Sequence, residues 1–130
     1  MSIVLATVCI AANMFTCQPT HVRVIDGDTI QIRSEKLRFD GIDAPELKGA
    51  CEDEVAVANL ARDRVVELFA GGHVVIERTG RDKYRRTLAQ ISVDGEDIGK
   101  ILMEEGLARR WEKKWKPGLD DVWCSGAQGR

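Results

Sequence analysis

Three carboxylates and two arginines in this sequence have the types and spacing of a site that acts on phosphate esters. Asp28 lies at the turn between the first two predicted strands, and Asp43 and Glu46 lie just beyond the third. Arg38 lies on the third predicted strand, and Arg86 opens the fifth. Carboxylates, together with a backbone carbonyl and waters, provide the hard oxygen ligands that bind Ca²⁺. A guanidinium binds phosphate oxygens through two parallel N–H groups and keeps its charge. Such a set would neutralise phosphate charge and activate a water for phosphodiester cleavage.

Spacing alone leaves a second interpretation open, in which the acids are solvated loop residues and the arginines form surface ion pairs. Several other chemistries lack their motifs, because the sequence contains no G-x-G-x-x-G, no G-x-x-x-x-G-K and no G-x-S-x-G. The two histidines, His21 and His73, begin predicted strands without a partner motif. We therefore predict that both are surface or strand-edge residues rather than ligands or bases.

The composition predicts one compact globular domain. The chain has 130 residues, of which 44% are hydrophobic and 31% charged, with a formal net charge of −2. Acidic blocks at residues 40–54 and 94–105 alternate with basic blocks at residues 78–86 and 109–116. A near-neutral total of this kind still allows a locally basic face beside a carboxylate cluster.

The elements that must position these residues are strands followed by helices. The pattern predicts strands over 21–33, bent at Asp26-Gly27-Asp28, and over 36–42, 73–79 and 87–93, with helices over 52–70 and 98–105. Parallel βαβ alternation is absent from this order. A small closed antiparallel barrel with added helices fits best, and the five-stranded OB barrel is one such architecture.

The first sixteen residues and the four cysteines leave the compartment open. Residues 3–12 form an apolar run with the length of a signal-peptide core, although no lysine or arginine precedes it, and a strand at the edge of the sheet is the alternative. Cytoplasmic and exported locations are both compatible with this pattern. Four cysteines allow three disulfide connectivities, or four buried thiols in a reducing compartment. If the chain is exported, we predict that Cys51 ties Cys124 of the tail to the barrel.

Three ordered motifs resemble the thermonuclease (staphylococcal nuclease-like) family. They are VIDGDT at residues 24–29, LRFDGIDAPE at residues 37–46 and DKYRRTLA at residues 82–89, and GLA at residues 106–108 continues the likeness. The resemblance covers residues 20–117 and implies a mainly β, α+β fold: a five-stranded OB barrel with about three helices. It also implies a Ca²⁺-dependent, sugar-nonspecific nuclease whose products carry a 3′-phosphate.

Matched position by position, the resemblance implies a role for each motif residue. Asp28, Asp43 and the carbonyl of Ala44 resemble the calcium ligands, and Glu46 resembles the general base. Arg38 and Arg86 resemble the pair of arginines that binds the scissile phosphate.

Further residues are candidates for substrate binding. Lys83 and Tyr84 match positions that contact a terminal phosphate, and Arg85 replaces the family's usual glycine, where it stiffens the loop or adds a phosphate contact. Trp111 and Trp115 are interpreted either as platforms for base stacking or as caps on the barrel core.

The resulting prediction is an N-terminal apolar segment at residues 1–16, a nuclease domain at residues 17–117 and a loosely structured tail at residues 118–130. We expect a DNA or RNA substrate and a monomeric protein. We also expect no membrane span, because no apolar run reaches about 18 residues. The alternatives are a barrel that binds nucleic acid or a protein with little or no catalysis, and a structural Ca²⁺-binding domain.

Overall fold

The structure is a computed structural model that describes residues 2–11, 13–111 and 123–124, with the backbone alone for residues 13–15. Along residues 2–11 and 13–111 the strands are β1 (Ile3–Ile10), β2 (Asn13–Asp26), β3 (Thr29–Ile32), β4 (Glu35–Phe39), β5 (Ile42–Asp43), β6 (His73–Arg81), β7 (Thr87–Val93), β8 (Glu96–Asp97) and β9 (Arg109–Arg110). The helices of the same ranges are α1 (Glu52–Phe69) and α2 (Ile98–Glu104).

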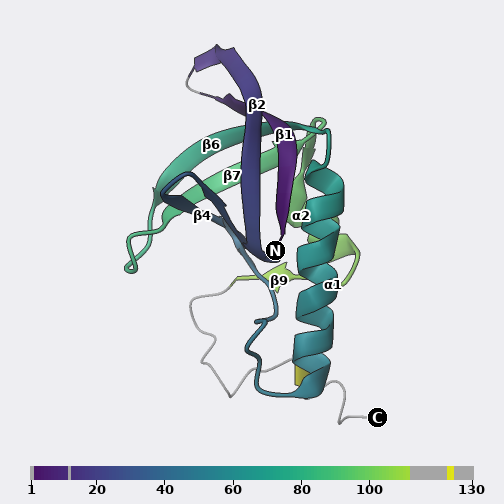
Figure 1. The fold of residues 1–130 in the computed structure, drawn as a ribbon. Helices are drawn as coiled ribbons and strands as arrows, with labels where there is room; N and C mark the ends of the chain where they lie inside the picture. Colours follow the sequence, from purple (N-terminus) through teal and green to yellow (C-terminus); the bar gives the residue numbers. More distant parts are fainter. Residues whose placement is uncertain (1, 12, 112–122, 125–130) are drawn as a thin grey trace.

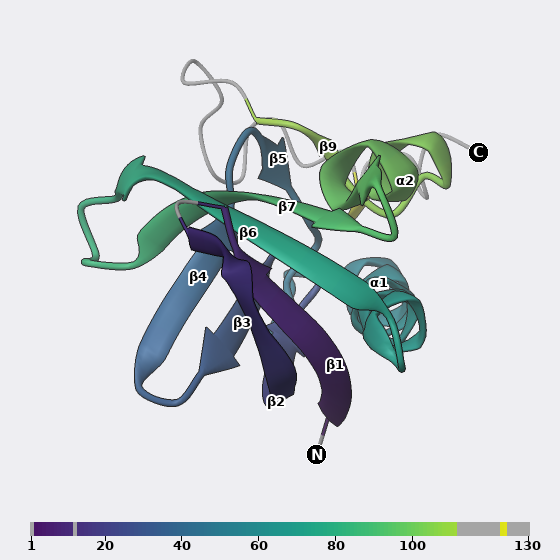
Figure 2. The same ribbon diagram turned by 90° about the horizontal axis from the view of Figure 1, so that it is seen from above.

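Six strands close into a barrel. The sheet order is β4-β3-β2-β1-β6-β7-β8, and a further pairing between β4 and β7 closes the ring. β5 and β9 form a separate two-stranded ribbon. Figure 1 shows α1 standing beside the barrel, and Figure 2 shows both helices on the same side of it. The predicted α+β class with an OB-like barrel is confirmed.

The strand β1 accounts for the main difference from the sequence prediction. It lies between β2, to which it is antiparallel, and β6, to which it is parallel. Its alternate residues Val4, Ala6 and Val8 are buried in the core, as expected for a strand with one inward face. The predicted edge strand is therefore an interior strand.

Four other details of the prediction need correction. The barrel has six strands rather than five, because β1 is inserted, and two of its pairings, β1–β6 and β4–β7, are parallel. The predicted boundary between residues 16 and 17 falls inside β2. Residues 2–11 and 13–111 contain two helices rather than about three.

The helix α1 covers the barrel and supports the turn that carries Asp28. It begins after Cys51, has three acids in its first turn, and ends before Gly71, whose φ is +66°. Its buried face includes Ala58, Ala61 and Val65. A Cβ placed on Gly27 would lie 2.7 Å from the Cβ of Ala61, so this glycine permits the close approach of turn and helix.

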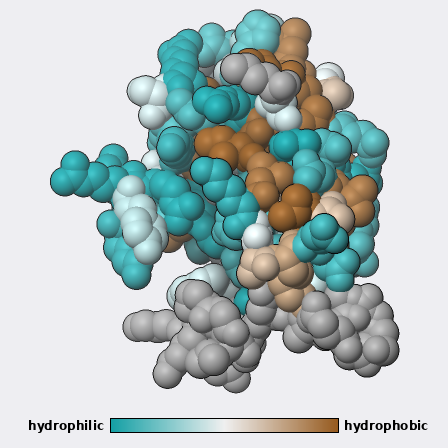
Figure 3. Space-filling model, turned by 60° about the horizontal axis from the view of Figure 1, so that its bottom comes forward, coloured by the Kyte–Doolittle hydropathy of each residue, from teal (hydrophilic) through white to brown (hydrophobic). Residues whose placement is uncertain are grey.

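The core fills the barrel interior with apolar side chains from every barrel strand and from α1. Its largest members include Phe39, Phe69, Ile30, Leu37 and Ile76. Figure 3 shows that apolar atoms also reach the middle of one outer face, with hydrophilic side chains around them. Among the described residues, no helix is long and apolar enough to span a membrane.

All four cysteines are paired in disulfides. Cys51 is bonded to Cys124, as predicted for an exported chain, and joins the start of α1 to the C-terminal tail. Cys9 is bonded to Cys17, which lies directly opposite it in the β1–β2 hairpin.

Candidate active site

Asp28 is the most deeply buried carboxylate of the candidate site. It follows the Gly27 turn at the start of β3, and only 3% of its surface is exposed. Its Oδ1 accepts a hydrogen bond from Thr29 Oγ1 at 2.9 Å, and its Oδ2 accepts one from the Ala44 backbone N–H at 2.9 Å. A buried carboxylate held by such donors keeps a fixed orientation. Asp28 and Ala44, two predicted metal ligands, are therefore in direct contact.

Arg38 bridges the two predicted metal-binding carboxylates. Its Nη2 lies 3.4 Å from Asp28 Oδ2 and 3.6 Å from Asp43 Oδ1, and its Nη1 donates to the Ile42 carbonyl at 3.0 Å. A second arginine, Arg109, donates from Nε to Asp43 Oδ2 at 3.2 Å. The register places Asp43 opposite Arg109 in the β5–β9 ribbon. Two cations therefore offset the acidic charge here.

Glu46 is held at the edge of this cluster through its backbone. It follows Pro45, which is fully buried, and its N–H donates to Oε2 of Glu54 at 3.0 Å. The other oxygen of Glu54, Oε1, accepts from the Ala50 N–H at 2.9 Å. Glu54 is 7% exposed, so one buried carboxylate in the first turn of α1 holds both ends of the segment that carries Glu46.

Burial and the charge of neighbouring carboxylates raise the pKa of three acids of the cluster, Asp26, Asp43 and Glu46. Desolvation, followed by repulsion from Asp28, raises the pKa of Asp43, and Arg109 and Arg38 oppose the rise. For Glu46, desolvation and then the charges of Asp28, Asp43 and Glu54 raise the pKa, although the residue as a whole is exposed. Burial, together with the charge and hydrogen bond of Asp28, raises the pKa of Asp26 to about 8. A divalent cation would relieve this repulsion.

The donor set fits a hard cation. Asp28 and Asp43 offer carboxylate oxygens within reach of the same guanidinium nitrogen, and Ala44 adjoins both. Oxygen donors of this kind suit Ca²⁺, which completes its coordination with carbonyls and waters.

Three of the predicted substrate-binding residues, Lys83, Tyr84 and Arg85, lie on the connection between β6 and β7, which Asp82 organises. Its Oδ1 accepts from the backbone N–H groups of Tyr84 and Arg86, both at 2.9 Å, and its Oδ2 accepts from Arg86 Nε at 2.7 Å. The exposed ring of Tyr84 lies 5.3 Å from Lys83 Nζ and 5.4 Å from Arg86 Cζ. The loop therefore presents cations around an aromatic ring.

Arg86 lies at the end of the β6–β7 connection, beside the strand that carries Arg38. It directly precedes Thr87, which pairs with Leu37, while Leu88 pairs with Arg38. In the structure Arg86 forms an ion pair with Asp82 of its own loop. Arg85 adopts φ +67°, which explains why glycine suits this position.

Of the two tryptophans predicted to bind substrate, Trp111 is 49% exposed and follows β9, where its backbone N–H donates to the Gly41 carbonyl at 2.9 Å. This exposure favours the stacking interpretation over a core cap for Trp111. Trp115 lies outside the described residues.

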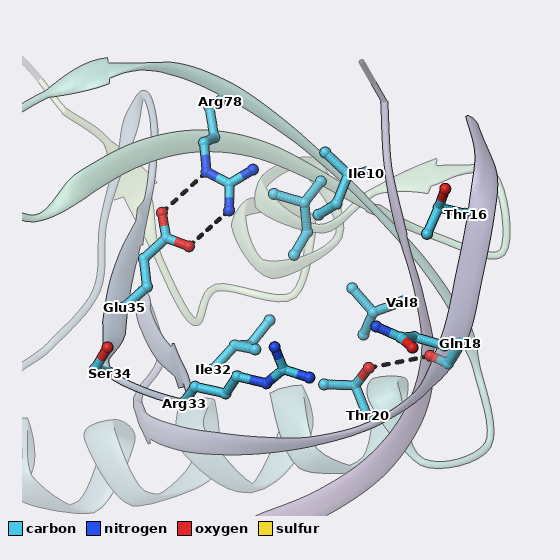
Figure 4. A pocket seen from close by; sticks show the side chains of 11 residues that line it. Val8, Ile10, Thr16, Gln18, Thr20, Ile32, Arg33, Ser34, Glu35 and Arg78 are labelled. Carbon is cyan, nitrogen blue, oxygen red and sulfur yellow. Dashed lines mark hydrogen bonds and ion pairs between the residues drawn. The ribbon is translucent and has the colours of Figure 1, made fainter. Parts of the chain in front are cut away.

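A separate cavity of about 350 Å³ opens at the other end of β3 from Asp28, where β3 turns into β4 (Figure 4). Apolar side chains including Val8, Ile10 and Ile32 line it. At its rim Arg78 Nε and Nη2 donate to Glu35 at 2.9 and 2.6 Å. This cavity lies apart from the carboxylate cluster.

Three residues of the cluster, Asp26, Glu54 and Arg109, are not among the residues predicted from the sequence. Asp26 belongs to the same DGD turn as Asp28 and was available from the motif. Glu54 looked like one of several helix-start acids, and only its burial distinguishes it. Arg109 follows the GLA motif, but its contact with Asp43 depends on the β5–β9 pairing.

Comparison with known proteins agrees with the motif assignment. The model of a family described as "Staphylococcal nuclease homologue" matches residues 36–121. Endonuclease YncB of Bacillus subtilis (strain 168) is 36% identical over 94 residues, which make up 67% of this chain and 44% of that protein.

Two further relatives extend this similarity. The thermonuclease of Staphylococcus intermedius is 36% identical over 93 residues, covering 67% of this chain and 55% of the relative. An uncharacterized endonuclease of Escherichia coli is 33% identical over 105 residues, covering 75% of this chain and 65% of the relative. The chain therefore spans less than two thirds of the length of each of these relatives.

Proposed function

Since this chain belongs to the staphylococcal nuclease homologue family, we propose that it is a Ca²⁺-dependent endonuclease that hydrolyses phosphodiester bonds of DNA, RNA or both and leaves 3′-phosphates. The observation that carries the proposal is the convergence of Asp28 and Asp43 on Arg38, with the Ala44 N–H bonded to Asp28 and Glu46 held at the edge of the cluster. The names of the relatives above agree with nuclease chemistry.

Each residue has a role in this proposal. The cation would be held by Asp28, Asp43 and the carbonyl of Ala44. When bound, it supplies positive charge that stabilises the negative charge of the phosphate. Glu46 accepts the proton of the attacking water, for which a raised pKa makes it a better base. Arg38 and Arg86 bind phosphate oxygens with their forks, and Arg86 lies near the departing 5′ oxygen.

The loop between β6 and β7 is proposed to bind the nucleotide. Lys83 and Arg85 contribute charge for flanking phosphates, and the exposed ring of Tyr84 contributes a contact surface. Trp111 is proposed to stack on a base, since its indole is exposed beside the basic β9. The same role is proposed for Trp115.

The proposal is tested by incubating the protein with single-stranded DNA and with RNA, in Ca²⁺ and in chelator, followed by end-group analysis. We expect cleavage in Ca²⁺ alone, with 3′-phosphate ends. Glu46→Gln should lower kcat on the order of 100-fold or more without loss of folding. Glu52→Gln, which alters an exposed acid nearby in the first turn of α1, should leave kcat unchanged.

Two results would contradict the proposal. Folded protein that binds the oligonucleotides in Ca²⁺ without cleaving them would indicate a binding module instead. A folded Glu46→Gln variant that cleaves at the parent rate would rule out Glu46 as the base.

A further inference from the structure

The β1–β2 hairpin carries a cluster of metal-binding side chains that is independent of the proposed nuclease site. Cys9 and Cys17 lie directly opposite each other, and His73 begins β6, the other neighbour of β1. Nε2 of His73 lies 3.1 Å from Sγ of Cys9. The two Sγ atoms and a ring nitrogen of His73 all lie within 4.8 Å of one another, the single such group of three among the described residues.

We propose that reduction of the Cys9–Cys17 disulfide creates a metal-binding site formed by Cys9, Cys17 and His73. The site would bind a thiophilic divalent cation such as Zn²⁺. Two thiolates and one imidazole are preferred zinc ligands, and a water supplies the fourth position of a tetrahedral site. In such a site the ligand atoms lie roughly 3.5–3.8 Å apart, given bonds of about 2.0–2.3 Å. The present separations are close enough for side-chain rotations to reach this geometry.

The accessibility of the three residues supports the proposal. Cys17 and His73 are exposed and Cys9 is buried, so a reductant reaches the disulfide through Cys17 and a water reaches the metal. The start of β6 is also fixed, since the His73 backbone N–H donates to Asp94 Oδ1 at 3.0 Å. The imidazole therefore comes from a backbone that is already in place, which lowers the entropic cost of binding.

The chemistry balances with a dithiol as reductant. Thiolate attack on the disulfide breaks the S–S bond, and a second attack releases two protein thiols while the dithiol becomes a disulfide. Binding of Zn²⁺ then displaces one proton from each thiol. The disulfide joins β1 to β2 alone, whereas the metal would join β2, β1 and β6, and so hold the inserted strand from both sides.

The test uses full-length protein reduced with a phosphine, which takes oxygen from water to become a phosphine oxide. Co²⁺ serves as a spectroscopic probe and Zn²⁺ as its competitor. Reduced wild-type protein should show a thiolate-to-cobalt charge-transfer band at one equivalent, and Zn²⁺ should remove it. Unreduced protein should show no such band.

Five variants locate the site. Cys9→Ser and Cys17→Ser should each weaken Zn²⁺ binding by about 100-fold or more, because a thiolate ligand is lost. His73→Ala should weaken it by about 10-fold or more, while His21→Ala, a change of an exposed histidine on β2, should have no effect. The Cys51→Ser/Cys124→Ser variant should bind as the parent does.

A second readout covers variants that fold poorly. Zn²⁺ should raise the Tm of reduced wild-type protein and of His21→Ala, and raise that of His73→Ala less. The absence of a thiolate band in reduced wild-type protein would overturn the proposal, as would equal binding by His73→Ala and His21→Ala. None of these readouts depends on nuclease activity, so failure here and failure of the proposed function are distinguishable.

Discussion

Oε2 of Glu54 accepts a hydrogen bond from the Glu46 backbone N–H at 3.0 Å, and this contact connects the first turn of α1 to the proposed general base. The same carboxylate accepts the Ala50 N–H through Oε1. Since Glu54 is buried, its carboxylate is partly shielded from bulk water, and this strengthens both bonds. Glu54 thus acts as a positioning residue.

Replacement of Glu54 by Gln should therefore lower kcat more than it changes KM. An amide has one oxygen, so one of the two backbone N–H groups loses its acceptor and the segment that carries Glu46 shifts. We expect kcat to fall about 10-fold or more, since misplacement of a catalytic group is costly. Steady-state kinetics measure this, with Glu52→Gln as the matched control. Equal kinetics for both variants would show that Glu54 does not position Glu46.

Replacement of Gly27 by Ala should destabilise the protein by about 1–3 kcal/mol, because the added Cβ would lie 2.7 Å from that of Ala61 and 3.0 Å from that of Ala44. Urea unfolding measures the loss. In the control Gly80→Ala, the new Cβ meets nothing within 4 Å, so a change of about 0.5 kcal/mol or less is expected. Similar losses in both variants would mean that the Gly27 contact does not limit stability.

Replacement of Arg85 by Gly should raise the free energy of unfolding by about 0.5–1 kcal/mol. The residue has φ +67°, a left-handed conformation that costs a non-glycine residue about 1–2 kcal/mol, partly offset by the greater entropy of unfolded glycine. The control is Arg81→Gly, in β6, where glycine should destabilise. Chemical denaturation of both variants decides the matter, and destabilisation by Arg85→Gly would contradict this account.

Glu35 should contribute to stability at neutral pH but not in acid. Its hydrogen bond from Arg78, with further help from Thr87, lowers its pKa below the ordinary value. A lowered pKa means that the folded state favours the charged form, so the stabilisation is present above the unfolded pKa and is lost as the pH falls through the folded pKa.

The matching measurement is urea unfolding of Glu35→Gln at neutral pH and at a pH below the pKa of Glu35. The deficit should be about 1 kcal/mol or less at neutral pH, because the pair is partly exposed and screened by water, and should vanish in acid. Glu77→Gln, at an exposed position on β6, serves as control. A deficit that persists unchanged in acid would show that it is not electrostatic.

The Cys51–Cys124 disulfide should contribute roughly 3–5 kcal/mol in the chain-entropy model, because it joins residues 73 apart in the sequence. Cys51→Ser/Cys124→Ser should lose this stability in chemical denaturation. Thiol titration of unreduced, unfolded protein should find no free thiols among the four cysteines. Four reactive thiols would contradict both pairings.

Local patterns in the sequence were sufficient to locate the motifs and most of the elements. Helix periodicity, first-turn acids and the Gly71 stop predicted residues 52–70, and α1 spans Glu52–Phe69. The strand predicted over 87–93 is β7, Thr87–Val93. These features depend on residues a few positions apart, whose spacing the sequence shows directly. The motif wording likewise identified Asp28, Arg38, Asp43 and Glu46, which the structure brings together.

The tertiary structure decided what depends on partners distant in the chain. The apolar run at residues 3–12 allowed either a signal-peptide core or an edge strand, and did not indicate that Ile3–Ile10 would lie between β2 and β6. That position depends on long-range pairing, such as that of Thr7 with His73. The contact of Arg109 with Asp43, 66 residues away, follows from the β5–β9 register. The same limit applies to Glu54, since its burial requires the segment before α1 to fold back over it. Pairing and burial depend on the free energy of the whole fold, which local sequence does not display.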